Sequence, residues 1–149
     1  LVMNRGHYYL VGNHENYDDM STLRVDRIAH ITVLNERRKP LREIKGYQQQ
    51  RTFNVSQYVK EHIYMFGGES ITVTFKARRS IVNQILDWFD GNVEFTNITA
   101  DNVVCRVRVN HDAFKYWALQ YMQSVKVLTP ASLVTEVKAA IEEGLHQYS

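Results

Sequence analysis

The residues best suited to chemistry in this sequence gather in one short region. Arg24 and Arg27 flank Asp26 in the segment STLRVDRIAHI, and Tyr8 and Tyr9 lie in the preceding segment HYYLVGN. A guanidinium presents a planar fork of N–H donors that matches carboxylate and phosphate oxygens, and a phenol can stack or hydrogen-bond. The arginines are therefore either solvated strand charges that pair with nearby acids, or part of an anion-binding face. The residue types alone leave both interpretations open.

Signatures of catalysis and of metal binding are missing from the sequence. No glycine-rich phosphate loop precedes a lysine, and no G-x-S-x-G elbow occurs. His7 and His14 could approach each other across a hairpin, but structural zinc takes four ligands, so we expect no metal site. The single cysteine, Cys105, alternates with valines at period two, which predicts a buried apolar residue and excludes an intrachain disulfide. We expect no enzyme and no cofactor.

The charge distribution is uneven although the net charge is small. The 149 residues carry a formal net charge of +2, and 44% of them are hydrophobic, which is typical of a folded protein. Between Arg24 and Arg51, eight lysines and arginines face three acids, so this stretch is the basic part of the chain. No apolar run approaches the length of a membrane span and no signal peptide is visible. We expect a cytoplasmic protein without membrane contact.

The first third of the sequence predicts β-structure. Residues 7–13 and 22–34 alternate as two long strands joined by a polar turn, and the register of the second changes near Arg27, as at a bulge or bend. Two strands cannot close a barrel or stand alone in water. The pattern therefore indicates a fragment of a longer protein, and its open edges should pair with another chain. Residues 35–51 are predicted to be a polar linker, followed by a short helix that ends before Gly67.

The remaining residues alternate between strand and helix patterns. Strands are predicted at 71–76, 92–98, 102–109 and 124–129, with one helix after the first strand and one after the third. Ser80 suits the N-cap of the first helix, Pro130 suits the first position of a last helix, and Gly144 suits its end. The order β-α-β-β-α-β with one further helix is that of a ferredoxin-like domain.

The segment HYYLVGNHENYDDMSTLRVDRI resembles the signature of the WYL domain. Tyr8, Tyr9 and Leu10 match the name-giving tripeptide, with Tyr8 where the family has Trp, and the Arg-x-Asp-Arg-Ile strand begins at Arg24. The second half, from MFGGESITVTFK through Trp88 to HDAFKYWALQYMQSVKVLTPASL, resembles the C-terminal extension that follows such a domain. Together the matches cover almost the whole chain.

The resemblance implies an α+β chain with two parts. A partial Sm/SH3-like β-barrel would occupy residues 1–45, a linker with a short helix 46–68, and the ferredoxin-like extension 69–149. The resemblance implies that this chain is the C-terminal part of a bacterial transcriptional regulator. The winged helix-turn-helix domain of such a regulator is not in this sequence, and only that domain would contact double-stranded DNA.

The resemblance also implies a function for the tyrosines and arginines. WYL domains are implied to sense an anionic ligand, a nucleotide or single-stranded nucleic acid, and the matching positions are Tyr9, Arg24 and Arg27, with Tyr8 a weaker candidate. Asp26 would orient an arginine, and the extension would form a homodimer and transmit the ligand state. The alternative is a protein-protein interaction module without a small ligand, in which the arginines would be buried in salt bridges across a subunit interface.

Overall fold

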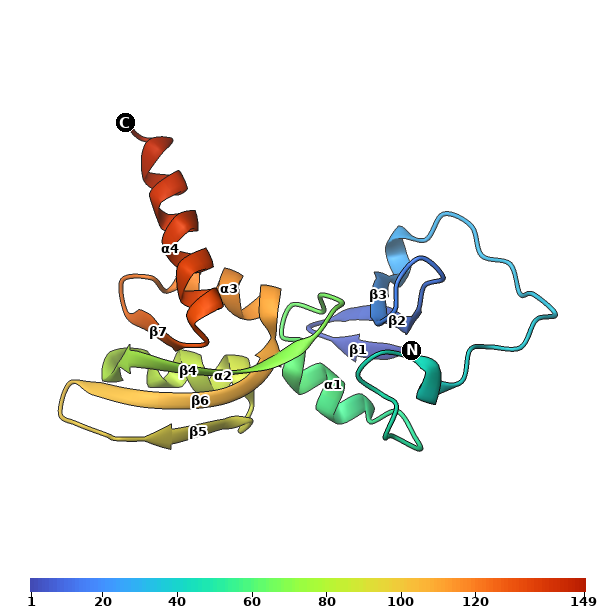
Figure 1. Cartoon of the computed structure of the whole chain (residues 1–149), viewed down its shortest axis with the longest axis horizontal. Coiled ribbons are helices and arrows are strands. Elements are labelled where there is room, and N and C mark those ends of the chain that lie inside the picture. The colour runs from blue at the N-terminus through green and yellow to red at the C-terminus, as the bar shows by residue number, and fades with distance from the viewer.

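The computed structural model describes all residues from 1 to 149, and they form two separate antiparallel sheets (Figure 1). The strands are β1 (Val2–Asn4), β2 (His7–Asn13), β3 (Met20–Arg24), β4 (Ser70–Arg78), β5 (Val93–Thr96), β6 (Asn102–Asn110) and β7 (Val125–Thr129). The helices are α1 (Val55–Glu61), α2 (Val82–Phe89), α3 (His111–Gln120) and α4 (Ala131–His146). Short 3-10 turns occur at Val25–Arg27, Leu41–Glu43 and Arg79–Ile81. None of the helices is long and apolar enough to cross a membrane.

The N-terminal sheet has the order β1-β2-β3 and stays open at both edges. The prediction that the second strand extends over residues 22–34 is wrong, because β3 ends at Arg24 and the 3-10 turn Val25–Arg27 follows. Beyond this turn the chain forms a long irregular loop that extends away from the rest of the molecule (Figure 1). Val33 in this loop is 94% exposed, and no neighbouring strand supplies the hydrogen bonds that would hold the segment in a sheet.

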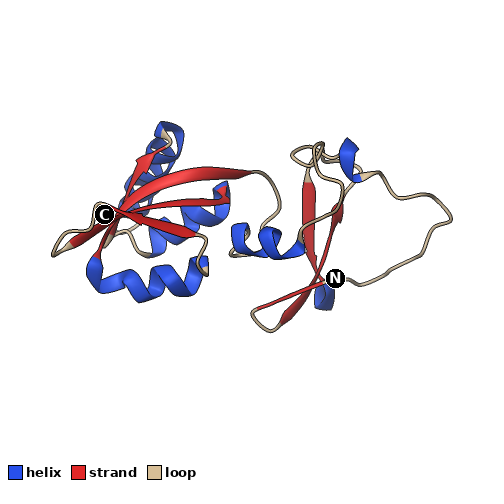
Figure 2. Ribbon diagram, turned by 90° about the horizontal axis from the view of Figure 1, so that it is seen from below, coloured by secondary structure: helices blue, strands red, loops and turns tan.

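A small apolar cluster ties this sheet to the segment that the sequence presents as a linker. Its buried members come from both regions and are Val2, Met20, Ile44, Tyr58 and Met65. The helix α1 begins at Val55, because the Asn54 side chain accepts a hydrogen bond from the backbone N–H of Gln57 at 3.0 Å. It ends at Glu61, several residues before the predicted boundary. The segment is therefore a packed part of the fold, and α1 lies between the two sheets (Figure 2).

The C-terminal sheet has the order β5-β6-β4-β7, and this confirms the ferredoxin-like prediction and the α+β fold class. Phe75 on β4 is fully buried and contacts the rings of Phe89 on α2 and of Phe114 and Trp117 on α3. Cys105 is buried beside Phe75 in the register, as predicted. Alternation along the strands thus places one face of the sheet under helices α2 and α3.

Three predicted helix boundaries differ from the structure. Ser80 lies inside the 3-10 turn that precedes α2 and makes no capping hydrogen bond, since Ile81 occupies the N-cap position. Pro130 is the N-cap residue of α4, one position before the predicted one. Helix α4 continues through Gly144 to His146, because Gly144 does not adopt the left-handed backbone conformation with which a glycine ends a helix.

Candidate functional site

Arg24 and Asp26 form a close two-point ion pair at the end of β3. The Arg24 Nε donates to Asp26 Oδ1 at 2.9 Å, and Nη2 donates to Oδ2 at 2.6 Å. The 3-10 turn after Arg24 folds Asp26 back toward its partner. The hydrogen bonds from Arg24 lower the pKa of Asp26 to about 2, with weaker contributions from the Arg24, His7 and Arg27 charges, while burial acts in the opposite direction. The pKa of Arg24 is raised, chiefly by the same hydrogen bonds. One edge of the guanidinium is therefore occupied by an internal carboxylate.

The two predicted tyrosines lie on opposite faces of the sheet. Tyr9 is directly opposite Arg24 in the β2–β3 register, so the two side chains share a face. Tyr8 is opposite Met3 on the other face and is 59% exposed. The structure thus brings Tyr9 to Arg24 but places Tyr8 away from both.

Arg27 lies in the 3-10 turn, is exposed, and forms no ion pair within 4 Å. Its charge nevertheless acts on Asp26, which places it within electrostatic reach of the Arg24–Asp26 pair. The arrangement is a guanidinium held by a carboxylate, with a free guanidinium and a tyrosine nearby. This geometry can accept an anion through Arg27 and through the remaining N–H donors of Arg24.

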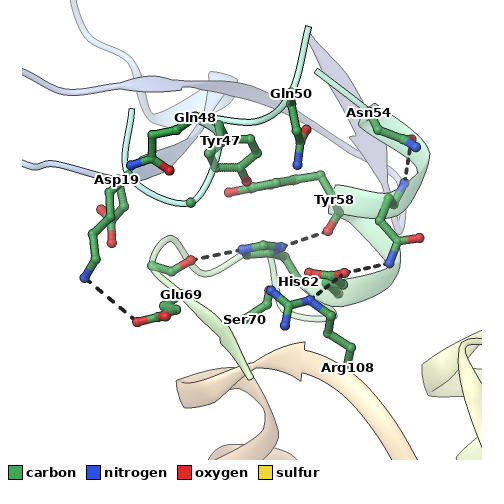
Figure 3. Close-up of a pocket in the computed structure, with 15 residues that line it drawn as sticks. Asp19, Tyr47, Gln48, Gln50, Asn54, Tyr58, His62, Glu69, Ser70 and Arg108 are labelled. Atoms are coloured by element: carbon green, nitrogen blue, oxygen red, sulfur yellow. Dashed lines mark hydrogen bonds and ion pairs between the residues drawn. The ribbon is translucent and has the colours of Figure 1, made fainter. Parts of the chain in front are cut away.

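A polar cavity of about 290 Å³ lies elsewhere, where the hairpin, α1 and the ferredoxin-like sheet meet (Figure 3). Its walls come from the end of the β2–β3 turn, the segment 45–50, the helix α1 and the facing ends of β4 and β6. Only two of the fifteen lining residues, Tyr47 and Tyr58, are hydrophobic in type. Burial raises the pKa of both tyrosines above its ordinary range, and the nearby Asp19 carboxylate adds to the effect.

The charged groups of this cavity are largely paired. Arg108 Nε lies 3.3 Å from Glu61 Oε1, to which the Gln57 side-chain amide also donates at 2.6 Å. Lys45 Nζ lies 3.9 Å from Glu69 Oε2 at the rim. Glu61 is nearly buried, and the two donors supply the hydrogen bonding that a carboxylate needs away from water.

His62 forms part of the same wall. Its ring stacks on Tyr58 with centroids 3.8 Å apart, Nδ1 lies 2.9 Å from the Tyr58 carbonyl oxygen and Nε2 lies 3.3 Å from that of Gly68. Burial lowers the pKa of His62, and the two carbonyl groups oppose this shift without overcoming it. The ring is therefore neutral near pH 7 and serves as a rigid spacer between α1 and the start of β4.

The sequence did not single out this cavity or a second basic surface. Alternation in ITVTFKAR and CRVRV places five cations on the uncovered face of the ferredoxin-like sheet: Lys76, Arg78, Arg106, Arg108 and Lys126. Lys76 is directly opposite Lys126. The alternation of charged and apolar residues along the strands predicts this basic face. No local sequence pattern predicts the cavity, because its walls come from separate segments. No group of three or more metal-ligating side chains is placed to hold a metal ion.

The fold and the two candidate sites define a two-part chain, a small β-sheet bearing cations at its end and a ferredoxin-like domain, with a polar cavity between them. Residues 68–145 match the family model of the WCX domain and residues 1–33 match that of the WYL domain. The WCX match spans more than half of the chain, and the chain belongs to this family. The two matches confirm the resemblance to the C-terminal part of a WYL-domain regulator.

A solved structure of a longer protein is similar to this chain over most of the chain's length. It is the proteasome accessory factor B/C (PafBC) of Arthrobacter aurescens, with 19% sequence identity and a TM-score of 0.49 over 97% of this chain. The chain spans about a fifth of the length of that protein, since the similarity covers 21% of it. No curated protein matches the sequence.

Proposed function

We propose that this chain is the effector-sensing and dimerisation region of a bacterial DNA-binding transcriptional regulator, acting by binding and not by catalysis. The family membership supports a regulatory role, and the division into residues 1–45, 46–68 and 69–149 remains part of the proposal. The ligand is an anion, a nucleotide or a single strand of nucleic acid. The observation that carries this ligand class is the free Arg27 guanidinium beside the oriented Arg24, with Tyr9 opposite.

The proposed mechanism is allosteric. An anion that contacts Arg24 and Arg27 would stabilise one arrangement of the sheet and the segment after it, and it would shift the equilibrium only by its differential affinity for the two arrangements. A winged helix-turn-helix elsewhere in the complete protein would respond to that shift. Cytoplasmic location and a homodimer belong to the same proposal.

The test is a binding titration with a fluorescently labelled single-stranded oligonucleotide at several salt concentrations. Arg24→Ala/Arg27→Ala should weaken binding. It should also make the plot of log binding constant against log salt concentration less steep, by ~0.7 for each phosphate of the single strand that the variant no longer neutralises. Lys76→Ala/Lys126→Ala removes the same number of charges from exposed sheet positions and serves as the matched control. Equal losses of affinity in the two double variants would reject a site at the arginines and indicate general attraction to positive charge.

The exposed apolar face of the N-terminal sheet favours the second candidate function, a protein-protein interaction module. Leu10 and Leu23 are directly opposite each other on this face and are 37% and 50% exposed, beside Tyr8 and Met3. Contiguous exposed apolar groups of this kind mark interaction surfaces. Sedimentation velocity of the wild type and of Leu23→Lys over a range of concentrations tests this candidate, because the substitution should dissociate an assembly built on this face. Unchanged association of Leu23→Lys would contradict the second candidate.

A further inference from the structure

The junction cavity joins parts of the chain that are distant in sequence. Asp19 comes from the end of the β2–β3 turn, Tyr47 from the segment before α1, and Arg108 from β6 (Figure 3). Any molecule bound there would contact the N-terminal sheet, α1 and the ferredoxin-like sheet at once. The cavity is therefore placed to influence how the two parts of the chain are held together, independently of the anion site proposed at Arg24 and Arg27.

The backbone around the cavity is fixed before any molecule binds. The N–H of Gly68 donates to the Met20 carbonyl oxygen at 3.2 Å, and a Cβ atom at Gly67 would lie only 2.9 Å from that oxygen, so a larger residue there would force the segments apart. The buried Asn110 side chain donates to the Gly67 carbonyl oxygen at 3.0 Å and caps α3 through the N–H of Ala113. These contacts hold the end of the hairpin against the start of β4.

The charges of the ionisable side chains that line the cavity do not sum to zero. Lys45 and Arg108 are paired with Glu69 and Glu61 respectively, and His62 is neutral. The carboxylate of Asp19 forms no hydrogen bond and no ion pair within 4 Å, so the lining carries one net negative charge. This unmatched charge disfavours a phosphate or a carboxylate ligand and favours a ligand with one positive charge.

The other groups in the lining are suited to an organic cation. Tyr47 contributes a partly exposed aromatic ring, and such rings attract ammonium and guanidinium groups and shield an apolar stem from water. Gln48 and Gln50 contribute side-chain carbonyl oxygens that can accept N–H donors and form no other hydrogen bond. The carboxylates of Glu61 and Glu69 are already engaged by protein cations, so no cluster of free oxygen ligands exists for a metal ion.

We propose that this cavity binds a small organic monocation, a primary ammonium or guanidinium group on a short apolar stem, with Asp19 as its counter-ion. The Tyr47 ring packs against the stem, and the Gln48 and Gln50 side-chain carbonyl oxygens accept hydrogen bonds from the ligand N–H groups that do not reach Asp19. Binding ties the hairpin end to the segment before α1 and so stiffens the junction. The ligand has the opposite charge to the one proposed for the arginines, so the two sites bind different molecules.

The test is an NMR titration of the full chain with butylguanidinium chloride, using n-butanol as the uncharged probe of similar size. We expect saturable shifts of backbone amide signals from residues 45–50 and 57–62, with a Kd on the order of 1 mM, and none with n-butanol. Asp19→Asn should weaken this binding at least about tenfold, the effect of losing roughly 1.4 kcal/mol of interaction. Asp18→Asn removes the neighbouring carboxylate, which does not line the cavity, and should leave binding unchanged.

Three results would overturn the proposal: no saturable binding up to about 10 mM, equal shifts with n-butanol, or the same Kd for the wild type and Asp19→Asn. The experiments distinguish a failure of the proposed cation site from a failure of the proposed anion site. Arg24→Ala/Arg27→Ala should keep full affinity for butylguanidinium, and Asp19→Asn should keep full affinity for the oligonucleotide. A fold check by circular dichroism accompanies each variant, and Asp19→Asn should pass it because the Asp19 carboxylate forms no hydrogen bond or ion pair in the fold.

Discussion

The Arg5 guanidinium lies 3.9 Å from the centroid of the Trp88 ring, and this contact joins the β1–β2 turn to α2 of the ferredoxin-like domain. Arg5 Nη2 also lies 3.5 Å from the carbonyl oxygen of Asp87. Trp88 is held in turn by Tyr64, whose ring centroid is 4.8 Å away, and by a 3.3 Å hydrogen bond from Nε1 to the Tyr121 hydroxyl. The N-terminal sheet is thus connected to the ferredoxin-like domain at a second place, distinct from the junction cavity.

Arg5→Ala should loosen this connection. The loss of a cation–π contact at a partly exposed site costs about 0.5–1 kcal/mol. We expect a correspondingly lower free energy of unfolding in urea and faster amide hydrogen exchange in β1 and β2, with unchanged exchange in β4 and β6. Arg42→Ala, at an exposed position in the Leu41–Glu43 turn, is the control and should change neither measurement. Unchanged exchange in β1 and β2 of Arg5→Ala would show that the contact does not hold the sheet.

The pair of Arg24 and Asp26 should persist into strongly acidic solution. Hydrogen bonding from Arg24 lowers the pKa of Asp26 from its ordinary value of 3.8 to about 2. A carboxyl group with a lowered pKa in the folded state stabilises the fold fully above its ordinary pKa, and this contribution is lost as the pH falls from about 4 toward about 2. Carboxyl carbon NMR should therefore show Asp26 titrating well below the exposed acids. In Arg24→Ala the Asp26 midpoint should return toward its ordinary value, and a midpoint that does not move would contradict the assigned cause.

Asp26→Asn tests whether Asp26 positions Arg24 for an anion. The substitution removes a negative charge, which on simple attraction alone would strengthen oligonucleotide binding. If Asp26 orients the guanidinium, affinity should instead fall by about 2–10-fold, because fixing a free side chain on binding costs ~0.5–1.5 kcal/mol. The measurement is the same oligonucleotide titration at constant salt. Asp18→Asn makes the same charge change without touching Arg24, and tighter binding by both variants would remove Asp26 from the site.

His62 should make the fold sensitive to mild acid. Burial lowers the pKa of its ring below the ordinary value of 6.5, so the unfolded chain binds a proton more readily than the folded chain. The contribution of His62 to stability is complete above pH 6.5 and decreases as the pH falls below that value. Urea unfolding between about pH 7 and about pH 5 should show this decrease, and His62→Gln should flatten it. His146→Gln, at the exposed end of α4, should retain the full slope.

Local patterns in the sequence determined much of this fold. The ferredoxin-like order follows from two kinds of local pattern. Residues 70–78 and 102–110 alternate between apolar and polar side chains, and Phe114, Trp117 and Ala118 recur at helical spacing. Both patterns bury their apolar side chains when helices cover one face of the sheet. The same alternation puts Tyr8 and Tyr9 on opposite faces of β2. The roles of Tyr9, Arg24 and Arg27 in binding a ligand stay a prediction.

Tertiary contacts decided what the patterns left open. The strand predicted over residues 22–34 stops at Arg24, because residues beyond the 3-10 turn meet no partner strand, and a strand needs one to satisfy its backbone. The junction cavity depends on Asp19, Gln48, Glu61 and Arg108, which lie in four segments of the sequence. Sequence spacing constrains neighbours within one helix or strand, whereas only the packing of the hairpin, α1 and the sheet brings these side chains to a common cavity.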